Sequence, residues 1–258
     1  MISKWAILVV CTLLGSSQSA FVDTLSQCAL KDHDCLKNLF QKLIIEYSST
    51  GVPEYGVPPF DPFKIKDITI PILGLLNITI EDAEGVGVKT CIIDSFSCDI
   101  EKGLAKVGIT CDIEAKGKFL VSGTNPISDH VYAGKNIHGN GNGEIKAEKL
   151  HMDLGFHYNL VRKENNEIYI SPLLDQTEFS YDMQNFHISA DNIFIGEEDV
   201  SEQFVSYINE NWKTILKLFG KTIFDQILKY LQEILTKLVD SVPITKVLSG
   251  DISSYVKN

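Results

Sequence analysis

The sequence lacks the motifs that mark common enzyme active sites. It contains no HExxH zinc-hydrolase motif and, in the mature chain, no GxSxG nucleophile motif. It also has no CxxC pair and no histidine at metal-ligand spacing. The glycine-rich stretch 139–143 lacks the Lys-Ser/Thr of a phosphate-binding loop, and we interpret it as a turn or a bend in a strand. We therefore expect no metal, no cofactor and no catalysis.

Beyond its first twenty residues, the chain has no long apolar segment free of charge. Lys4 precedes a short apolar run at 5–14, and small residues follow as far as Ala20. This order is typical of a secretory signal peptide. The run is too short to span a bilayer, which needs about 20 residues. We predict that residues 1–20 are a signal peptide and that residues 21–258 form a single secreted domain with no transmembrane segment.

Basic residues are too few to favour an anionic partner. Once the signal peptide and its Lys4 are removed, 22 basic residues stand against 34 acidic ones, a net charge of −12. Such a surface repels nucleic acid and anionic membranes. We therefore predict no nucleic-acid partner, and we interpret the charge as favouring solubility.

Five of the six cysteines remain after the signal peptide, so at least one is free or paired between chains. Two predicted strands, 90–100 and 108–117, carry Cys98 and Cys111 on their apolar faces. A turn centred midway between these two cysteines places them opposite each other. We predict a Cys98–Cys111 disulfide with Cys91 as the leftover thiol. The alternative is that Cys98 and Cys111 are buried free thiols.

The spacing of apolar residues changes twice along the chain. Residues 24–47 show helical spacing, and the proline-rich stretch 51–62 predicts an extended connector. Residues 64–195 alternate apolar and polar side chains, as antiparallel strands do; 150–160 is the clearest. Residues 199–242 return to helical spacing with a wide apolar face, which predicts a helix roughly 60 Å long. We predict an α+β fold in which one antiparallel sheet wraps this long C-terminal helix.

Asn77-Ile78-Thr79 is an N-glycosylation sequon. Asn77 lies on the polar face of its predicted strand, where a glycan would extend into solvent. Asn77 is therefore our candidate glycosylation site.

Several short motifs occur together in a characteristic order. Cys28 and Cys35 form an early pair, the stretch 57–63 reads Val-Pro-Pro-Phe-Asp-Pro-Phe, and the stretch 209–212 reads Asn-Glu-Asn-Trp at the start of the long helix. Other matching stretches are 76–80, 139–141, 207–208 and 241–243. In this order and spacing, the chain resembles the insect Takeout and juvenile-hormone-binding protein family over essentially all of residues 24–248.

The resemblance implies a short N-terminal helix and a long C-terminal helix wrapped by a curved, highly twisted antiparallel sheet, with an elongated internal hydrophobic cavity. It implies secretion into haemolymph or chemosensory fluid and binding of juvenile hormones, fatty acids or similar apolar molecules. It also implies a Cys28–Cys35 disulfide, and a lid formed by residues 25–47. The chain departs from the family pattern over 123–138 and in its three cysteines between residues 91 and 111.

We predict a secreted, monomeric carrier that binds a small hydrophobic ligand, a terpenoid hormone or a fatty acid, without catalysis. The predicted lining residues are apolar or aromatic side chains on the inward faces of strands and helix. They are Ile70, Phe96, Ile113, Tyr132, Phe156, Tyr158, Tyr181, Phe204, Ile208, Trp212, Ile215 and Phe219. The three tyrosines can also donate a hydrogen bond to the polar end of a ligand.

Two other hypotheses are open at this point. The chain could be a secreted interaction or signalling protein with a filled core that acts through its surface, with a receptor or another carrier as its partner. It could also be a lipid-ester hydrolase, which needs a nucleophile and a base within hydrogen-bond reach. A structure without a tunnel would favour the first hypothesis, and an esterase assay tests the second.

Overall fold

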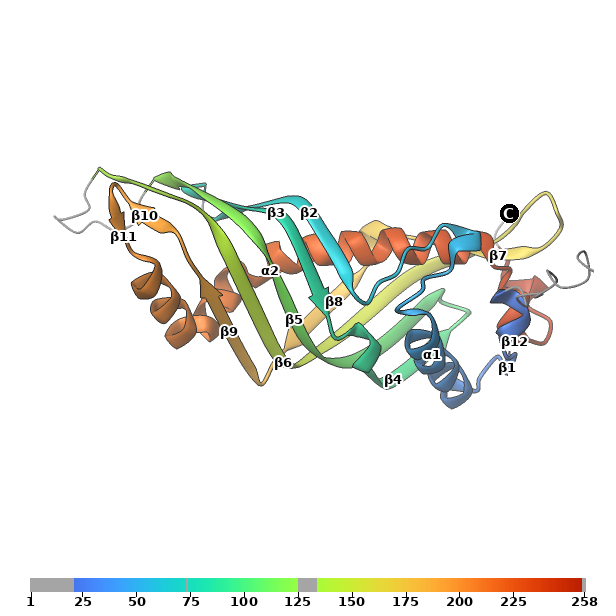
Figure 1. Ribbon diagram of the computed structural model, residues 1–258. Helices are drawn as coiled ribbons and strands as arrows, with labels where there is room; N and C mark the ends of the chain where they lie inside the picture. Colours follow the sequence, from blue (N-terminus) through green and yellow to red (C-terminus); the bar gives the residue numbers. More distant parts are fainter. Residues whose placement is uncertain (1–20, 73, 125–133, 257–258) are drawn as a thin grey trace, which may run out of the picture.

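The structure is a computed structural model, and it describes residues 21–72, 74–124 and 134–256. Two α-helices lie in these ranges, α1 (His33–Tyr47) and α2 (Ser201–Ser241). Figure 1 shows α2 extending along most of the length of the molecule with the sheet curved around it. The long helix predicted over 199–242 is therefore confirmed, and so is the helix wrapped by a curved antiparallel sheet.

Ten strands in the described residues form one sheet, in the order β11-β10-β6-β5-β3-β2, with β4 on β5 and with β7, β8 and β9 on β6. Their bounds are β2 (Phe63–Ile72), β3 (Leu76–Val86), β4 (Ile92–Asp99), β5 (Leu104–Thr124), β6 (Asn136–Arg162), β7 (Ile168–Pro172), β8 (Glu178–Asp182), β9 (Asn185–Ala190), β10 (Ile193–Ile195) and β11 (Glu198–Asp199). The strand β6 pairs with β5 on one side and with β10, β9, β8 and β7 in turn on the other.

Two register shifts bend the long strands. In β6 an extra residue near Lys149, whose φ is +50°, moves the inward-facing positions from odd to even numbers. In β3 the pairing with β5 shifts by one residue at Glu81. Glu81 lies opposite Asp67 of β2, which has a φ of +53°. Bulges of this kind increase the local twist of a sheet. They let these strands curve around α2 while their apolar side chains stay on the inner face.

Of the two expected arrangements for the glycines at 139–143, a turn or a bend in a strand, the turn is wrong, because they lie inside β6. A Cβ atom added to Gly139 would overlap the carbonyl oxygen of Asn192, and one added to Gly141 would overlap that of Asp191. The glycines are therefore needed where the link between β9 and β10 crosses close to β6. The expectation of a turn failed because the spacing of glycines does not distinguish a turn from a close approach of two backbones.

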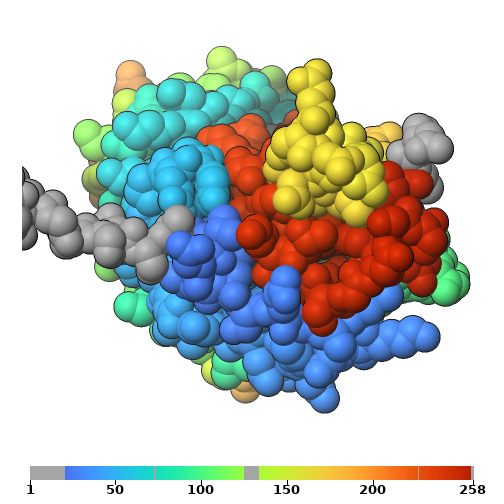
Figure 2. All heavy atoms as spheres, turned by 90° about the vertical axis from the view of Figure 1, so that its right-hand side faces the viewer, coloured from blue at the N-terminus to red at the C-terminus, as the bar shows by residue number. Residues whose placement is uncertain are grey.

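The N-terminal helix is shorter than predicted. It begins at His33 rather than at residue 24, and a 3₁₀ turn, Phe21–Thr24, precedes it. A strand, β1 (Cys28–Ala29), lies between them and pairs in parallel with β12 (Leu248–Ser249). The Cys28–Cys35 disulfide joins β1 to the first turn of α1, as the resemblance implies. In Figure 2 the N-terminal segment in blue and the C-terminal residues in red lie side by side at this end of the molecule.

The proline-rich connector 51–62 folds back on itself rather than running extended. Val52 and Val57 exchange backbone hydrogen bonds of 2.9 and 3.2 Å around the 3₁₀ turn Pro53–Tyr55. Both valines are buried, and they pack with Phe21 and Val242 beyond the end of α2. Proline sets the local backbone angles, but the burial of the two valines decides that the segment turns.

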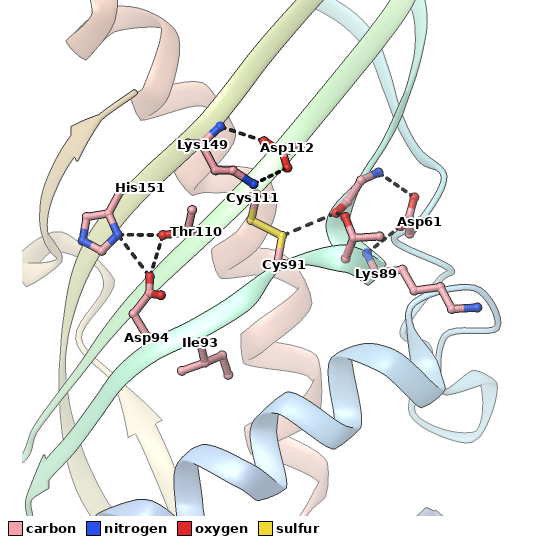
Figure 3. The surroundings of a disulfide bond; sticks show 12 residues. Asp61, Lys89, Cys91, Ile93, Asp94, Thr110, Cys111, Asp112, Lys149 and His151 are labelled. Atoms are coloured by element: carbon pink, nitrogen blue, oxygen red, sulfur yellow. Dashed lines mark hydrogen bonds and ion pairs between the residues drawn. A yellow bond between two sulfur atoms is a disulfide. The ribbon is translucent and has the colours of Figure 1, made fainter. Parts of the chain in front are cut away.

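The second disulfide joins Cys91 to Cys111, and Cys98 is the free thiol (Figure 3). The predicted Cys98–Cys111 bridge and the prediction that Cys91 is the leftover thiol are therefore wrong. Strands β4 and β5 turn over residues 99–104, earlier than predicted, so Cys98 lies opposite Ala105. A one-residue shift of the pairing between Ile93 and Ser95 then brings Cys91, just before β4, next to Cys111.

We expect replacement of both Cys91 and Cys111 by serine to lower the free energy of unfolding by about 3 kcal/mol, since this disulfide closes a 20-residue loop. The Cys98→Ser control leaves both disulfides intact and should have a smaller effect in denaturant titrations. Peptide mapping without reduction should recover the Cys91–Cys111 pair. A Cys98–Cys111 peptide would contradict the register of this hairpin.

Candidate functional site

The core of the described residues is divided into separate buried clusters, and two of them, the β10 cluster and the central cluster, lie between the sheet and α2. The β10 cluster consists of Leu76, Val121, Ile137, Ile193, Ile195 and Val200. The central cluster consists of Ala147, Leu150, Met183, Leu216 and Phe224. The α1 cluster consists of Cys28, Leu36, Leu39, Tyr158, Leu160, Ile168, Ile244, Leu248 and Ile252. A small cluster of Phe21, Val52, Val57 and Val242 lies beside the end of α2.

Between the β10 cluster and the central cluster, the inner face of β6 is incompletely covered. Ile145 lies there, with its side chain on the same face as that of Ala147 in the central cluster. Its chain neighbours Glu144 and Lys146 pair with each other and with charged residues on the outer face. Ile145 is nevertheless 41% exposed. An isoleucine on the inner face of a filled core would be buried, so apolar surface is left uncovered here.

The predicted lining residues divide into two groups, apart from Tyr132, which lies outside the described residues. Six belong to the clusters or pack against them: Phe204, Ile113, Tyr181, Trp212, Phe96 and Tyr158. Five lie outside the clusters: Ile70, Phe156, Ile208, Ile215 and Phe219. Of these five, Ile70 is buried and the other four are half-buried. The spacing of Ile208, Ile215 and Phe219 places them along one stripe of α2.

Polar contacts fix α2 to one margin of the sheet. The side-chain amide of Asn209 accepts from the N–H of Ile188 on β9 at 2.8 Å and donates to its carbonyl at 2.9 Å. Farther along, Gln232 Nε2 donates to the carbonyl of Leu174 at 3.0 Å. On the other margin α2 approaches β2, but no hydrogen bond joins the two among the described residues. We call the side formed by β9, β8 and the 3₁₀ turn Leu174–Gln176 the anchored margin.

Two of the tyrosines predicted to bind a ligand through their hydroxyls already have protein partners. The Tyr181 hydroxyl donates to the carbonyl of Leu216 at 2.7 Å. The Tyr158 hydroxyl lies 3.0 Å from Cys98 Sγ. Burial raises the pKa of the Tyr181 hydroxyl and of both the Tyr158 hydroxyl and the Cys98 thiol, so all three are neutral near pH 7. Cys98 is therefore a protonated thiol with low reactivity.

Two hollows on the surface lie on the polar outer face of the sheet. One, of about 600 Å³, is lined by residues that include Lys116 and Glu144. The other, of about 490 Å³, includes Asp153 and Glu178 in its lining. Neither has the apolar lining expected of the predicted ligand site.

In the part of the chain that the structure describes, no group of three or more His, Cys, Asp or Glu side chains is placed to hold a metal ion. In the same part, no helix has the length and apolar character needed to cross a bilayer.

Residues 6–249 match the model of the haemolymph juvenile hormone binding protein family. The chain belongs to this family. Its resemblance to Takeout and juvenile-hormone-binding proteins is thereby confirmed, and membership supports a carrier of hydrophobic ligands. The crystal structure of Takeout 1 from Epiphyas postvittana has a TM-score of 0.75 with 22% identity, over 88% of this chain and 100% of that one, so the two share a fold.

A crystal structure of lipopolysaccharide binding protein has a TM-score of only 0.30 with 13% identity, over 81% of this chain and 37% of that one. A similarity this low carries no argument about fold or ligand. No curated protein sequence matches the chain significantly.

In this member of the juvenile hormone binding protein family, α1 covers the free edge of β4. Gln41 accepts from the N–H of Ile93 at 2.7 Å and donates to the carbonyl of Cys91 at 2.9 Å. Lys37 and His33, one and two turns earlier on the same face, contact two further β4 carbonyls at 2.8 and 3.2 Å. The three side chains thus occupy backbone groups that another strand would otherwise pair with.

Sequence reasoning did not identify the roles of Gln41 and Asn209. Both are amide side chains at the border of an apolar helix face. An amide carries a donor and an acceptor, so it can satisfy both backbone groups of an edge strand. An amide residue at the border of an apolar helix face is the sequence signal that could have identified Gln41 and Asn209.

We expect Gln41→Leu to loosen α1, because the N–H of Ile93 and the carbonyl of Cys91 lose their partner at a cost of about 1–3 kcal/mol. Amide hydrogen exchange should become faster in α1 and β4 and stay unchanged in α2. Lys42→Ala, which removes an exposed ion pair with Glu46, is the control and should change little. Equal protection of α1 in both variants would contradict this role of Gln41.

Proposed function

We propose that this protein is a secreted, non-enzymatic carrier that holds one long apolar molecule between α2 and the sheet. The observation that carries the proposal is the exposure of Ile145 on an inward-facing position between two buried clusters. Burying apolar surface contributes about 25 cal/mol per Å², so a ligand that covers a few hundred Å² gains several kcal/mol. Exposed apolar surface on an inward-facing position favours an apolar occupant.

A terpenoid such as a juvenile hormone, or a fatty acid, fits the composition of this segment. Ile208 and Ile215 provide half-buried apolar side chains on α2, and Ile145 provides exposed apolar surface on the inner face of β6. Since the hydroxyls of Tyr158 and Tyr181 have protein partners, we propose that contact with the ligand is mainly apolar. Family membership supports the same class of ligand.

We propose that residues 1–20 are a signal peptide, that residues 21–258 form one domain, and that the monomeric protein is exported to haemolymph or chemosensory fluid. The two disulfides support an oxidising compartment. The test is to sequence the N-terminus of the exported protein. A secreted chain that still began at Met1 would contradict the proposed cleavage near Ala20.

We expect Ile145→Trp to fill the uncovered segment and to weaken binding of a fluorescent apolar probe about tenfold, which corresponds to about 1.4 kcal/mol. The matched control is Leu120→Trp, because Leu120 is 38% exposed on the outer face of the neighbouring strand β5. The control should bind the probe as the unchanged protein does. Equal affinities of both variants would place the ligand elsewhere.

The direct test is to extract the purified protein with organic solvent and identify the extract by mass spectrometry. Fatty acids and a juvenile hormone are then tested for displacement of the fluorescent probe. Failure of the probe to bind, together with an extract free of lipid, would rule out the carrier. It would favour an interaction protein that acts through its surface.

Asn77 is exposed on β3, and we propose that it carries a glycan. Its strand partners are Pro71 and Ser122, and its side chain lies on the outer face. We expect enzymatic removal of N-glycans to lower the mass of the secreted protein, and Asn77→Gln to abolish this change without affecting probe binding. An unchanged mass after treatment of the wild-type protein would show that the site is unoccupied.

A further inference from the structure

Three aromatic rings meet between β8 and α2 at the middle of the molecule. Phe179 and Tyr181 lie on β8, with ring centroids 5.5 Å apart. Phe224 of α2 lies 5.4 Å from the first ring and 4.1 Å from the second. Phe224 is part of the central cluster, and the two strand residues pack against that cluster. We call these three side chains the aromatic wall.

The Tyr181 ring is held in place by the backbone of α2. Its hydroxyl donates to the carbonyl of Leu216, and it lies so close to Gly220 that any Cβ there would overlap the phenolic oxygen. Glycine within a helix lowers helix stability by about 1 kcal/mol relative to alanine. At position 220 this cost is offset by the space that glycine leaves for the Tyr181 hydroxyl. Two independent features therefore fix the wall in one position.

The central cluster, against which the aromatic wall packs, also includes contacts from the sheet side. Ile113 of β5 packs against the central cluster from the sheet side. The central cluster and the aromatic wall together therefore join β5, β6, β8 and α2 at this point.

Incompletely covered apolar side chains lie on both sides of the wall. On the β10 side, Ile145 is 41% exposed. On the α1 side, Ile227 of α2 is 36% exposed, although it lies seven residues before Ile234, on the same helix face. Ile234 packs against the cluster beside the end of α2, so this face is directed inward. Apolar surface is thus left partly uncovered on both sides of the central cluster.

We infer that the aromatic wall of Phe179, Tyr181 and Phe224 limits the length of ligand the protein accepts, by separating these two partly uncovered surfaces. The inference rests on the proposed carrier function and adds a selectivity for chain length. Phe204, at the β10 cluster, and Leu216, at the wall, are separated on α2 by about 18 Å along the helix axis. Extended decanoic acid fits within that length, whereas extended icosanoic acid does not.

The test measures displacement of a fluorescent apolar probe by a series of saturated fatty acids from decanoic to docosanoic acid. For the wild-type protein, affinity should rise with chain length, reach a maximum and then fall. Tyr181→Ala opens the wall and should move the maximum to longer acids, raising the affinity for icosanoic acid about tenfold or more as additional methylene groups become buried. Tyr181→Phe keeps the ring and should retain the wild-type maximum.

Phe224→Ala, which opens the wall from the helix side, is the second variant, and circular dichroism verifies that each variant is folded. The inference is overturned if wild-type affinity rises without a maximum through docosanoic acid, a result that needs no variant. It is also overturned if folded Tyr181→Ala or Phe224→Ala retains the wild-type maximum. If no acid and no probe binds to the wild-type protein, the carrier function itself is refuted.

Discussion

The apolar face of α2 must be covered along 41 residues, and in the described chain the only large element available to cover it is the sheet. A flat sheet would touch a straight helix along only one line. The extra residues near Lys149 in β6 and at Glu81 in β3 bend the strands, and the long β5–β6 pair extends the curved surface. The curvature of the sheet is therefore a consequence of covering one long helix with one sheet.

The polar contacts of the anchored margin hold the helix at the side of this curved surface. Asn209, Gln232 and the Tyr181–Leu216 hydrogen bond all link α2 to that margin. If α2 moved toward β3 and β5 to fill the interior, these contacts would break, at about 1 kcal/mol for each hydrogen bond. Because the hydrogen bonds favour the margin and apolar burial favours the centre, the packing stays incomplete around Ile145.

Periodicity was enough to predict the long helix and the alternation along most of the strands, because burial of one face dominates both. It placed Ile92 on the apolar face of its strand, whereas the register shift in β4 leaves Ile92 exposed and buries Ile93. It did not predict the start of α1, which depends on the pairing of β1 with β12 across almost the whole chain. The Cys91–Cys111 pairing was missed because it depends on the position of one turn and on a one-residue shift of the β4–β5 pairing between Ile93 and Ser95, and neither has a clear sequence signal. For the predicted lining residues, whether Ile208 or Trp212 packs in a cluster depends on three-dimensional spacing, which pattern does not give.

The residues that determine the stability of the fold differ from those that would determine which ligand binds. Residues such as Leu216 and Val121 are almost fully buried, and truncating a large residue of that kind typically costs 2–5 kcal/mol. Ile208, Ile215 and Phe219 are half-buried outside the clusters, so substitutions there remove fewer contacts within the protein. The segment that would contact a ligand can therefore change shape between relatives while the clusters keep the fold intact.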